Sequence, residues 1–286
     1  MTRVILATLF LASCAEAQTK PAITAQQIVD RIQKEVGVPW HAQTVDTFKA
    51  GDPNTVVTGV AVTMMATLDV LQRAAAEGKN FVITHEPTFY SHLDGVADLK
   101  KDNDPVLAAK EAFIREHHMV VWHFHDHWHM RHPDGIQIGM ERALGWEKFQ
   151  SADNPHLFTL PSTTLGDLAA SLKQKLNLQV MRVVGDRNMR VTKIALIPGA
   201  AGSLTHIKAL ERGDVEVLVI GEVPEWETVE YVDDANAAKQ HKALIMLTHI
   251  PSEQAGMEEC TRWLRGFVSE VPVEFVAAKQ PFWEPK

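Results

Sequence analysis

Phe81-Val82-Ile83-Thr84 is the stretch that decides the fold, a short apolar run that passes directly into His85-Glu86. Its length and its β-branched residues predict a strand that is buried on both faces. A second run of this kind, Met119-Val120-Val121-Trp122, follows a helical pattern over residues 105–117. Short buried strands that alternate with helices are typical of a mostly parallel α/β architecture, which we therefore predict for this chain.

The same alternation extends outward from this stretch toward both ends of the chain. Helices are predicted over residues 23–36, 68–78, 136–144, 164–176 and 257–267, and strands over residues 55–64, 180–184, 194–197, 217–220, 244–247 and 273–276. Residues 151–161 contain two prolines and are the best candidate for a linker. We therefore expect a first α/β half over residues 21–150 and a second over residues 151–286.

The composition is that of a globular protein without a nucleic-acid surface. The chain has 286 residues, which is enough for one large domain or two small ones, each with its own core. Its formal net charge is −8 and it contains no block of lysine and arginine, so we expect no nucleic-acid partner. Histidine is the unusual component, because seven of the 14 histidines lie within residues 117–132.

Residues 1–20 are predicted to be an export signal rather than part of the fold. Residues 4–12 are apolar, but this run is too short to span a bilayer as a mature helix. Ala15-Glu16-Ala17 fits ordinary signal cleavage, whereas Leu11-Ala12-Ser13-Cys14 resembles the lipobox of bacterial lipoproteins. Both alternatives stay open. The expected location is therefore periplasmic, secreted, or attached to a bacterial membrane through a lipid at Cys14.

Metal-binding types of side chain follow four of the predicted strands. These are His85-Glu86, the segment from His123 to His129, Gly221-Glu222, and Thr248-His249 with Glu253 four residues later. In open α/β sheets, ligands bind just beyond the carboxyl ends of the strands, so we expect these side chains to converge. Each motif also has a simpler explanation, since His85-Glu86 alone could be an ordinary loop pair and Glu222 an exposed strand-end residue. Together they favour a metal site.

The chemistry of such a set is that of a two-metal centre. Neutral imidazole and carboxylate bind divalent zinc, manganese or iron, which are the ions we expect here. A bridging carboxylate allows two cations to lie about 3.5–4 Å apart and to generate a hydroxide at neutral pH. The glycine-rich turn at residues 199–203 could cradle a phosphate, but it lacks the Gly-x-Gly-x-x-Gly pattern and any lysine. We expect it to pack tightly against the sheet instead.

The motifs in their order resemble those of a known family. They are Thr58-Gly59-Val60-Ala61, Ile83-Thr84-His85-Glu86-Pro87, residues 135–145, Gly221-Glu222 and His249-x-x-x-Glu253. The series covers roughly residues 23–283 and looks like the NGG-interacting-factor-three-like proteins. These are dinuclear metal-centre proteins often labelled GTP cyclohydrolase type 2 homologues.

The resemblance implies an architecture and a set of ligands. It implies two interlocked α/β halves, with residues 244–286 returning to the first half, and a toroidal homohexamer with a two-metal site in its cleft. The principal ligands that it implies are His85, Glu86, His129, His249 and Glu253.

The sequence departs from the family pattern at two places. The family usually has a His-His pair where this chain has His85-Glu86, and its His-x-x-x-Asp pattern appears here as His125-x-x-x-His129. His129 therefore takes the aspartate position, and the alternative is that Asp126 is the ligand.

These observations favour an exported, metal-dependent hydrolase of an unknown small-molecule substrate. The expected nucleophile is a metal-bound hydroxide, and His125 is the residue expected to relay protons or orient the site. Two rival interpretations are a metal-binding or storage module without turnover and a structural ring protein whose metals only brace the cleft. If the protein is an enzyme, we expect hydrolysis of a cyclohydrolase-like or phosphoester type, and the export signal makes cytoplasmic GTP an awkward substrate because it would separate the protein from that pool.

Overall fold

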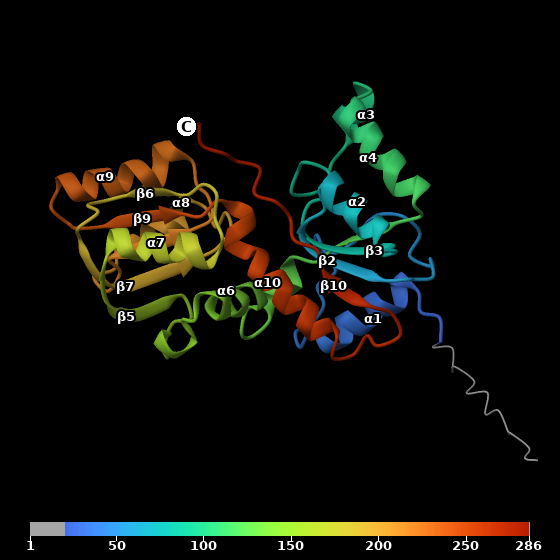
Figure 1. Cartoon of the computed structure of the whole chain (residues 1–286), viewed down its shortest axis with the longest axis horizontal. Helices are drawn as coiled ribbons and strands as arrows, with labels where there is room; N and C mark the ends of the chain where they lie inside the picture. Colours follow the sequence, from blue (N-terminus) through green and yellow to red (C-terminus); the bar gives the residue numbers. More distant parts are fainter. Residues whose placement is uncertain (1–20, 286) are drawn as a thin grey trace, which may run out of the picture.

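Two five-stranded sheets, each flanked by helices, lie side by side and are joined by the long helix α10 (His249–Leu264) and the shorter α6 (Gly135–Leu144) (Figure 1). The computed structural model describes residues 21–285, so the predicted export signal at residues 1–20 lies outside the described residues. Within residues 21–285, no helix combines the length and the apolar character needed to cross a membrane.

The first sheet contains the stretch that decides the fold. Its strand order is β1 (Phe48–Ala50), β4 (Val120–His123), β3 (Phe81–Glu86), β2 (Val60–Met65) and β10 (Val273–Phe275). Strands β4, β3, β2 and β10 run parallel, and only β1 at the edge is antiparallel. Every residue of β3 and β4 is buried, which explains why both read as continuous apolar runs. The predicted α/β fold with mostly parallel sheets is therefore confirmed.

The second sheet follows the same plan with two antiparallel edges. Its strand order is β5 (Leu157–Thr164), β7 (Arg190–Ile197), β8 (Val217–Ile220), β9 (Ala243–Met246) and β6 (Arg182–Val184). Strands β7, β8 and β9 are parallel, whereas β5 and β6 run antiparallel to their neighbours. The linker expected at residues 151–161 is wrong in its second part, because β5 begins at Leu157 and includes Pro161. An edge strand tolerates a proline, since one side of it makes no ladder hydrogen bonds.

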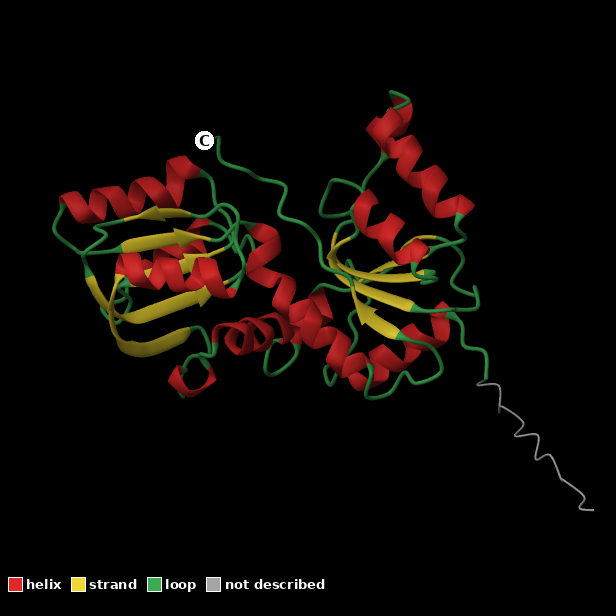
Figure 2. Cartoon of the chain, in the orientation of Figure 1, coloured by secondary structure: helices red, strands yellow, loops and turns green. Residues whose placement is uncertain are grey.

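Helices cover both sheets (Figure 2). Those of the first domain are α1 (Ala25–Glu35), α2 (Leu68–Ala76), α3 (Ala97–Lys101), α4 (Pro105–Glu116) and α5 (Asp126–Met130). Those that follow α6 are the 3₁₀ turn η1 (Glu147–Phe149), α7 (Leu165–Lys175), α8 (Ser203–Leu210), the π-helical turn η2 (Glu225–Val229), α9 (Glu230–Ala237) and α10. Side chains of Thr24, Thr67 and Asp104 accept backbone N–H groups at the starts of α1, α2 and α4 and so fix where these helices begin.

Helices α6 and α10 cross with their backbones in contact. A Cβ atom at Gly139 of α6 would lie 2.3 Å from the carbonyl oxygen of Ala255 in α10. A Cβ atom at Gly256 of α10 would lie 2.5 Å from the Cα atom of Ile136 in α6. Only glycine has no Cβ, so the two residues together permit this close crossing.

The chain passes between the domains more than once. After β9 in the second sheet, α10 leads to β10, which pairs with β2 in the first sheet through Val273 and Val60. The C-terminal segment then runs back toward the second domain (Figure 1). There the Gln280 side chain accepts hydrogen bonds from the N–H groups of Gln179 and Val180, at 2.9 and 3.1 Å, and donates to the Val180 carbonyl. The two domains are therefore tied together at several places.

Candidate metal centre

The residues predicted as ligands lie at strand ends that meet where the two domains join. His85 and Glu86 are the last two residues of β3. His125 and His129 lie at the start and within the short helix α5, which begins three residues after β4. Residues four apart share one face of a helix, so both imidazoles face the same way. His249 and Glu253 occupy the first turns of α10, which begins three residues after β9.

The carboxylate of Glu253 lies among three imidazoles. Its Oε2 atom is 3.1 Å from Nε2 of His249 and 3.7 Å from Nε2 of His85. Its Oε1 atom is 3.8 Å from Nε2 of His129. Side chains that are 168 residues apart in the sequence thus come within contact distance, and Glu253 itself is only 3% exposed.

The carboxylate of Glu86 lies beside the same group. Its Oε1 atom is 3.3 Å from Nε2 of His249 and 3.9 Å from Nε2 of His125. Two overlapping sets have ligand atoms that all lie within 4.8 Å of one another: His85 with His125 and His129, and His85 with Glu86 and Glu253. All six predicted site residues are therefore brought together, and His85 belongs to both sets.

Each of the four histidines makes a hydrogen bond through its Nδ1 atom, on the side of the ring away from the carboxylates of Glu86 and Glu253. The acceptors are the Phe124 carbonyl for His85 at 3.2 Å, Asp126 for His125 at 3.0 Å, Asp134 for His129 at 2.9 Å and Glu222 for His249 at 3.0 Å. Because these acceptors take the proton on Nδ1, they leave Nε2 to face the carboxylates. Histidines that bind metal in proteins are oriented by hydrogen bonds of this kind.

The environment of the Nε2 atom of His85 suits a metal ligand. His85 is fully buried, and its Nε2 atom has no hydrogen-bond partner among the described residues. Burial, together with the neighbouring His129 and His125, holds the pKa of His85 well below its ordinary value. The ring is therefore neutral, which is the form that coordinates a cation. A buried nitrogen without a partner is costly, and a divalent cation would satisfy it.

The carboxylates make the site strongly negative. Burial opposes protonation of His249, but hydrogen bonds to Glu222, Glu253 and Glu86 outweigh it and raise its pKa to about 12. Burial likewise opposes ionisation of Glu86, yet its hydrogen bond with His249 leaves the pKa of Glu86 below the ordinary value. Three carboxylates around one imidazole attract positive charge, and a divalent cation bound there would replace the proton of His249.

Asp126, the alternative ligand, faces away from the two carboxylates. Its Oδ2 atom accepts hydrogen bonds from the Thr44 hydroxyl at 2.8 Å and from the Val45 N–H at 3.1 Å, while its Oδ1 atom holds His125. Burial opposes ionisation, but the hydrogen bonds from His125, Thr44 and Val45 outweigh it and lower the pKa of Asp126 to about 2. This geometry favours His129 as the ligand, with Asp126 orienting His125.

Asp46 is an important residue of the site that the sequence did not indicate. Its buried carboxylate accepts hydrogen bonds from the N–H groups of His125, Asp126 and His127, at 2.6 to 2.9 Å, and from Nδ1 of His127 at 2.7 Å. His127 also accepts the N–H of His41 at 2.9 Å. His127 is thus a structural histidine, and Asp46 anchors the start of the helix that presents His125 and His129.

The glycine turn at residues 199–202 makes room for Glu253. Gly199 has a φ of +70°, and a Cβ atom at this position would lie 2.2 Å from Oε1 of Glu253. Its N–H donates to the Ser252 hydroxyl at 3.0 Å. The turn therefore packs closely against the start of α10, whereas the sequence predicted tight packing against the sheet, and glycine is needed because the carboxylate passes so near.

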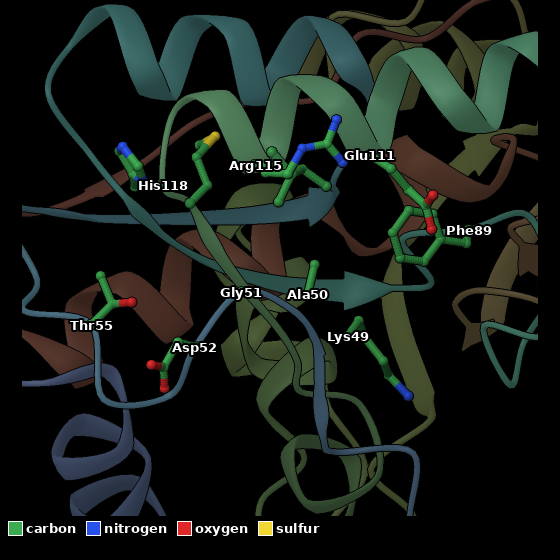
Figure 3. A pocket seen from close by; sticks show the side chains of 11 residues that line it. Lys49, Ala50, Gly51, Asp52, Thr55, Phe89, Glu111, Arg115 and His118 are labelled. Carbon is green, nitrogen blue, oxygen red and sulfur yellow. The ribbon is translucent and has the colours of Figure 1, made fainter.

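Two adjoining cavities open onto the site. One of about 280 Å³ is lined by His125, His129, His249 and Glu253 among others. The second, of about 480 Å³, shares Glu86 and His249 with it and extends to Lys110 of α4. Another cavity of about 480 Å³ lies against β1 and α4 and is lined by charged residues of both signs, including Lys49, Glu111 and Arg115 (Figure 3). It contains none of the clustered ligand atoms.

Comparison with known proteins identifies relatives across nearly the whole chain. A family model described as Duf34/NIF3 (NGG1p interacting factor 3) matches residues 23–281. A Clostridium acetobutylicum protein named GTP cyclohydrolase 1 type 2 homolog is 22% identical over 234 residues, which cover 78% of this chain and 82% of that protein. A Staphylococcus aureus protein of the same name is 34% identical over 97 residues, which are 34% of this chain and 24% of that protein.

Solved structures match the fold at low sequence identity. A Bacillus cereus protein related to NIF3 superposes with a TM-score of 0.72 at 14% identity, and the match covers 92% of this chain and 99% of that chain. A hypothetical protein of Staphylococcus aureus gives a TM-score of 0.71 at 19% identity with the same coverage. These two likenesses show the arrangement of both sheets and carry no information about activity.

Proposed function

Because the chain belongs to the Duf34/NIF3 family, as its sequence predicted, we propose that it binds two divalent cations and hydrolyses a small-molecule substrate. The observation that carries this proposal is the convergence of four imidazole Nε2 atoms on the carboxylates of Glu86 and Glu253. One of these atoms, Nε2 of His85, is buried without any partner among the described residues. A purely structural cluster would be expected to satisfy such an atom.

The residues divide between two cation positions. His85, His125 and His129 would hold one cation, while Glu86 and Glu253, with the nearby Nε2 of His249, would hold the other. In this division His125 would be a ligand, which is an alternative to the predicted role of relaying protons or orienting the site. The choice of zinc, manganese or iron is compatible with a nitrogen and oxygen donor set.

The bound cations would supply a nucleophile, since a divalent cation lowers the pKa of water enough for hydrolysis at neutral pH. The residues of this chain perform the other tasks. Asp46 and Asp134 fix the positions of His125 and His129 through hydrogen bonds. Glu222 holds the Nδ1 proton of His249 and lies half exposed at the entrance. The cavities beside Glu86 and His249 provide space for a small substrate.

Metal analysis tests the binding part of the proposal. We expect inductively coupled plasma mass spectrometry of the purified protein to give two ions per chain, and markedly fewer for Glu253→Gln. The matched control is Glu258→Gln on the exposed side of the same helix, which should bind as the wild type does. Fewer than one ion per chain in gently purified wild-type protein would refute the two-metal centre.

A hydrolysis screen separates an enzyme from a metal store or a structural ring. Phosphomonoesters, phosphodiesters and nucleotides would be tested with the wild type, Glu253→Gln and Glu258→Gln. An activity present in the wild type and Glu258→Gln but absent from Glu253→Gln supports the hydrolase. Equal rates in all three proteins would come from a contaminant and would favour storage.

Export and assembly are further parts of the proposal that can be tested on the whole protein. We propose that residues 1–20 direct export, so mass spectrometry of the mature N-terminus should find either a lipidated Cys14 or a new start at Gln18. An N-terminus that retains Met1 would refute export. We also propose a homohexamer, as the family resemblance implies, and native mass spectrometry would refute it by finding only the monomer.

A further inference from the structure

Lys110 of α4 is a buried ammonium group without an anionic partner in the described part of the chain. The residue is 4% exposed, and no carboxylate among residues 21–285 lies within 4.0 Å of its Nζ atom. Nζ donates a hydrogen bond to the Thr88 carbonyl and lies 5.3 and 5.8 Å from the ring centres of Tyr90 and Phe89. Among the described residues, Asp94 is the carboxylate whose charge acts on the pKa of Lys110, and it already forms ion pairs with Lys49 and His123.

The buried ammonium group of Lys110 needs an anionic partner from outside the chain. Buried lysines are almost always paired, because transfer of an unpaired ammonium from water costs several kcal/mol. An ammonium has three N–H donors, and the Thr88 carbonyl uses one of them. Burial lowers the pKa of Lys110 to about 8, so the group is still mostly charged at neutral pH.

A second unsatisfied donor lies beside it. The Thr88 hydroxyl is buried and has no hydrogen-bond partner among the described residues. Next to it, Tyr90 adopts a φ of +62°, an uncommon conformation for a residue with a side chain, and the residue is 57% exposed. An ammonium, a hydroxyl donor and an aromatic ring therefore meet at one wall of a cavity.

That cavity leads to the metal centre. It has a volume of about 480 Å³, within the range of small-molecule sites, and its lining includes Thr88, Tyr90 and Lys110 as well as Glu86 and His249. Thr88 follows Glu86 by two residues, so their Cα atoms are at most about 7 Å apart. One small molecule can thus have a group bound by Lys110 and, at the same time, the bond to be hydrolysed near Glu86.

We propose that Lys110 and Thr88 form an anion-binding subsite that holds a phosphate group of the substrate beside the metal centre. A phosphate has several acceptor oxygens and can satisfy both the ammonium and the hydroxyl, and lysine serves as a point charge for phosphate. Glu86 and Glu222 also line the cavity, so bound cations should strengthen phosphate binding by neutralising them. This inference rests on the proposed function, because the phosphate belongs to the substrate of that centre.

Calorimetric titration with inorganic phosphate tests the subsite. The proteins are wild type, Lys110→Met, Thr88→Val and the control Lys101→Met, whose lysine is exposed on α3. Each would be titrated both stripped with EDTA and loaded with metal. We expect the Kd for phosphate to rise about 10-fold or more in Lys110→Met, several-fold in Thr88→Val, and not at all in Lys101→Met.

Thr88→Val keeps the test decisive even if Lys110→Met does not fold. It replaces an unpaired hydroxyl by a methyl group of similar size, so the fold should be retained. Wild-type phosphate affinity in the folded variants, or no phosphate binding by the wild type, would overturn the subsite.

Metal content measured on the same samples separates the two proposals. If Lys110-dependent phosphate binding persists in a protein that binds no metal, the hydrolase centre fails and the subsite stands. If metal and hydrolysis are present but phosphate binding is independent of Lys110, only the subsite fails.

Discussion

Replacement of Gly199 by alanine should displace Glu253 from the metal centre. The added Cβ atom would lie 2.2 Å from Oε1 of Glu253, whereas even close carbon–oxygen contacts are about 3.3 Å long. The carboxylate must therefore move by roughly 1 Å. Because Glu253 is the flexible partner, the movement is expected in its side chain rather than in the backbone of the turn.

The displacement can be converted into an effect on metal binding. Metal–ligand distances vary by only about 0.2 Å, so a shift of this size removes Glu253 as a ligand. Loss of an orienting group behind a ligand typically costs 10- to 100-fold in metal affinity, and we expect at least about 100-fold for a ligand itself. The same variant also places alanine at a φ of +70°, which costs about 1–2 kcal/mol of folding free energy.

Gly202→Ala is the matched control for this experiment. Gly202 has a φ of +87°, and a Cβ atom there would have no neighbour within 4 Å. Both variants should lose about 1–3 kcal/mol of unfolding free energy in urea with EDTA present. Only Gly199→Ala should lose metal in a competition titration with a chromophoric chelator. Wild-type affinity in Gly199→Ala, or equal loss in Gly202→Ala, would refute the argument.

Three further predictions concern the fold that supports the site. His206 is fully buried, and burial lowers its pKa to about 4. In the unfolded chain the pKa of His206 is near 6.5, so the unfolded state binds more protons than the folded state as the pH falls. The free energy of unfolding of the metal-free wild type should therefore fall by about 2 kcal/mol between pH 7 and pH 5, and that of His206→Leu should lack this decrease. Urea unfolding that shows the same pH dependence in both proteins would contradict this. Asp46→Ala leaves three backbone N–H groups without their acceptor. The free energy of unfolding measured in urea should therefore fall by about 3–5 kcal/mol. The exposed control Asp52→Ala should lower it by about 1 kcal/mol or less. Gly139→Ala forces a Cβ atom against the Ala255 carbonyl. The free energy of unfolding, measured by thermal unfolding, should therefore fall by about 1–3 kcal/mol although alanine favours helix formation. A higher melting temperature would show that α6 and α10 can move apart without loss of stability.

The central strands were predictable because burial determines their residues. Strands β3, β4, β8 and β9 are buried along their whole length, and a strand buried on both faces is a short apolar run. The edge strand β5 was missed, because its sequence LFTLPSTT alternates only partly and contains a proline. Local pattern does not distinguish such an edge strand from a loop, since its stability comes from its pairing with β7.

The candidate site could be predicted in its residue types but not in its supporting contacts. His85, Glu86, His249 and Glu253 follow apolar runs, and the carboxyl ends of parallel strands meet at one edge. Asp46 had no such signal, because the N–H groups that it holds lie 79 to 81 residues further along the chain. The different fate of His127 follows from helical geometry, since it lies two residues from both His125 and His129 and therefore on another face of α5.

The repeated passage of the chain between its domains has a mechanical consequence. Helix α6 and helix α10 touch backbone to backbone at Gly139 and Gly256, and the segment ending at Gln280 adds a third tie. Closure of two domains about a hinge requires a single axis of rotation. Three separate connections between the domains leave no such axis. We therefore expect the spacing between Glu86 and Glu253 to change little when a ligand binds. If cations bind between Glu86 and Glu253 as proposed, we expect them to be selected by how well they fit this preset gap.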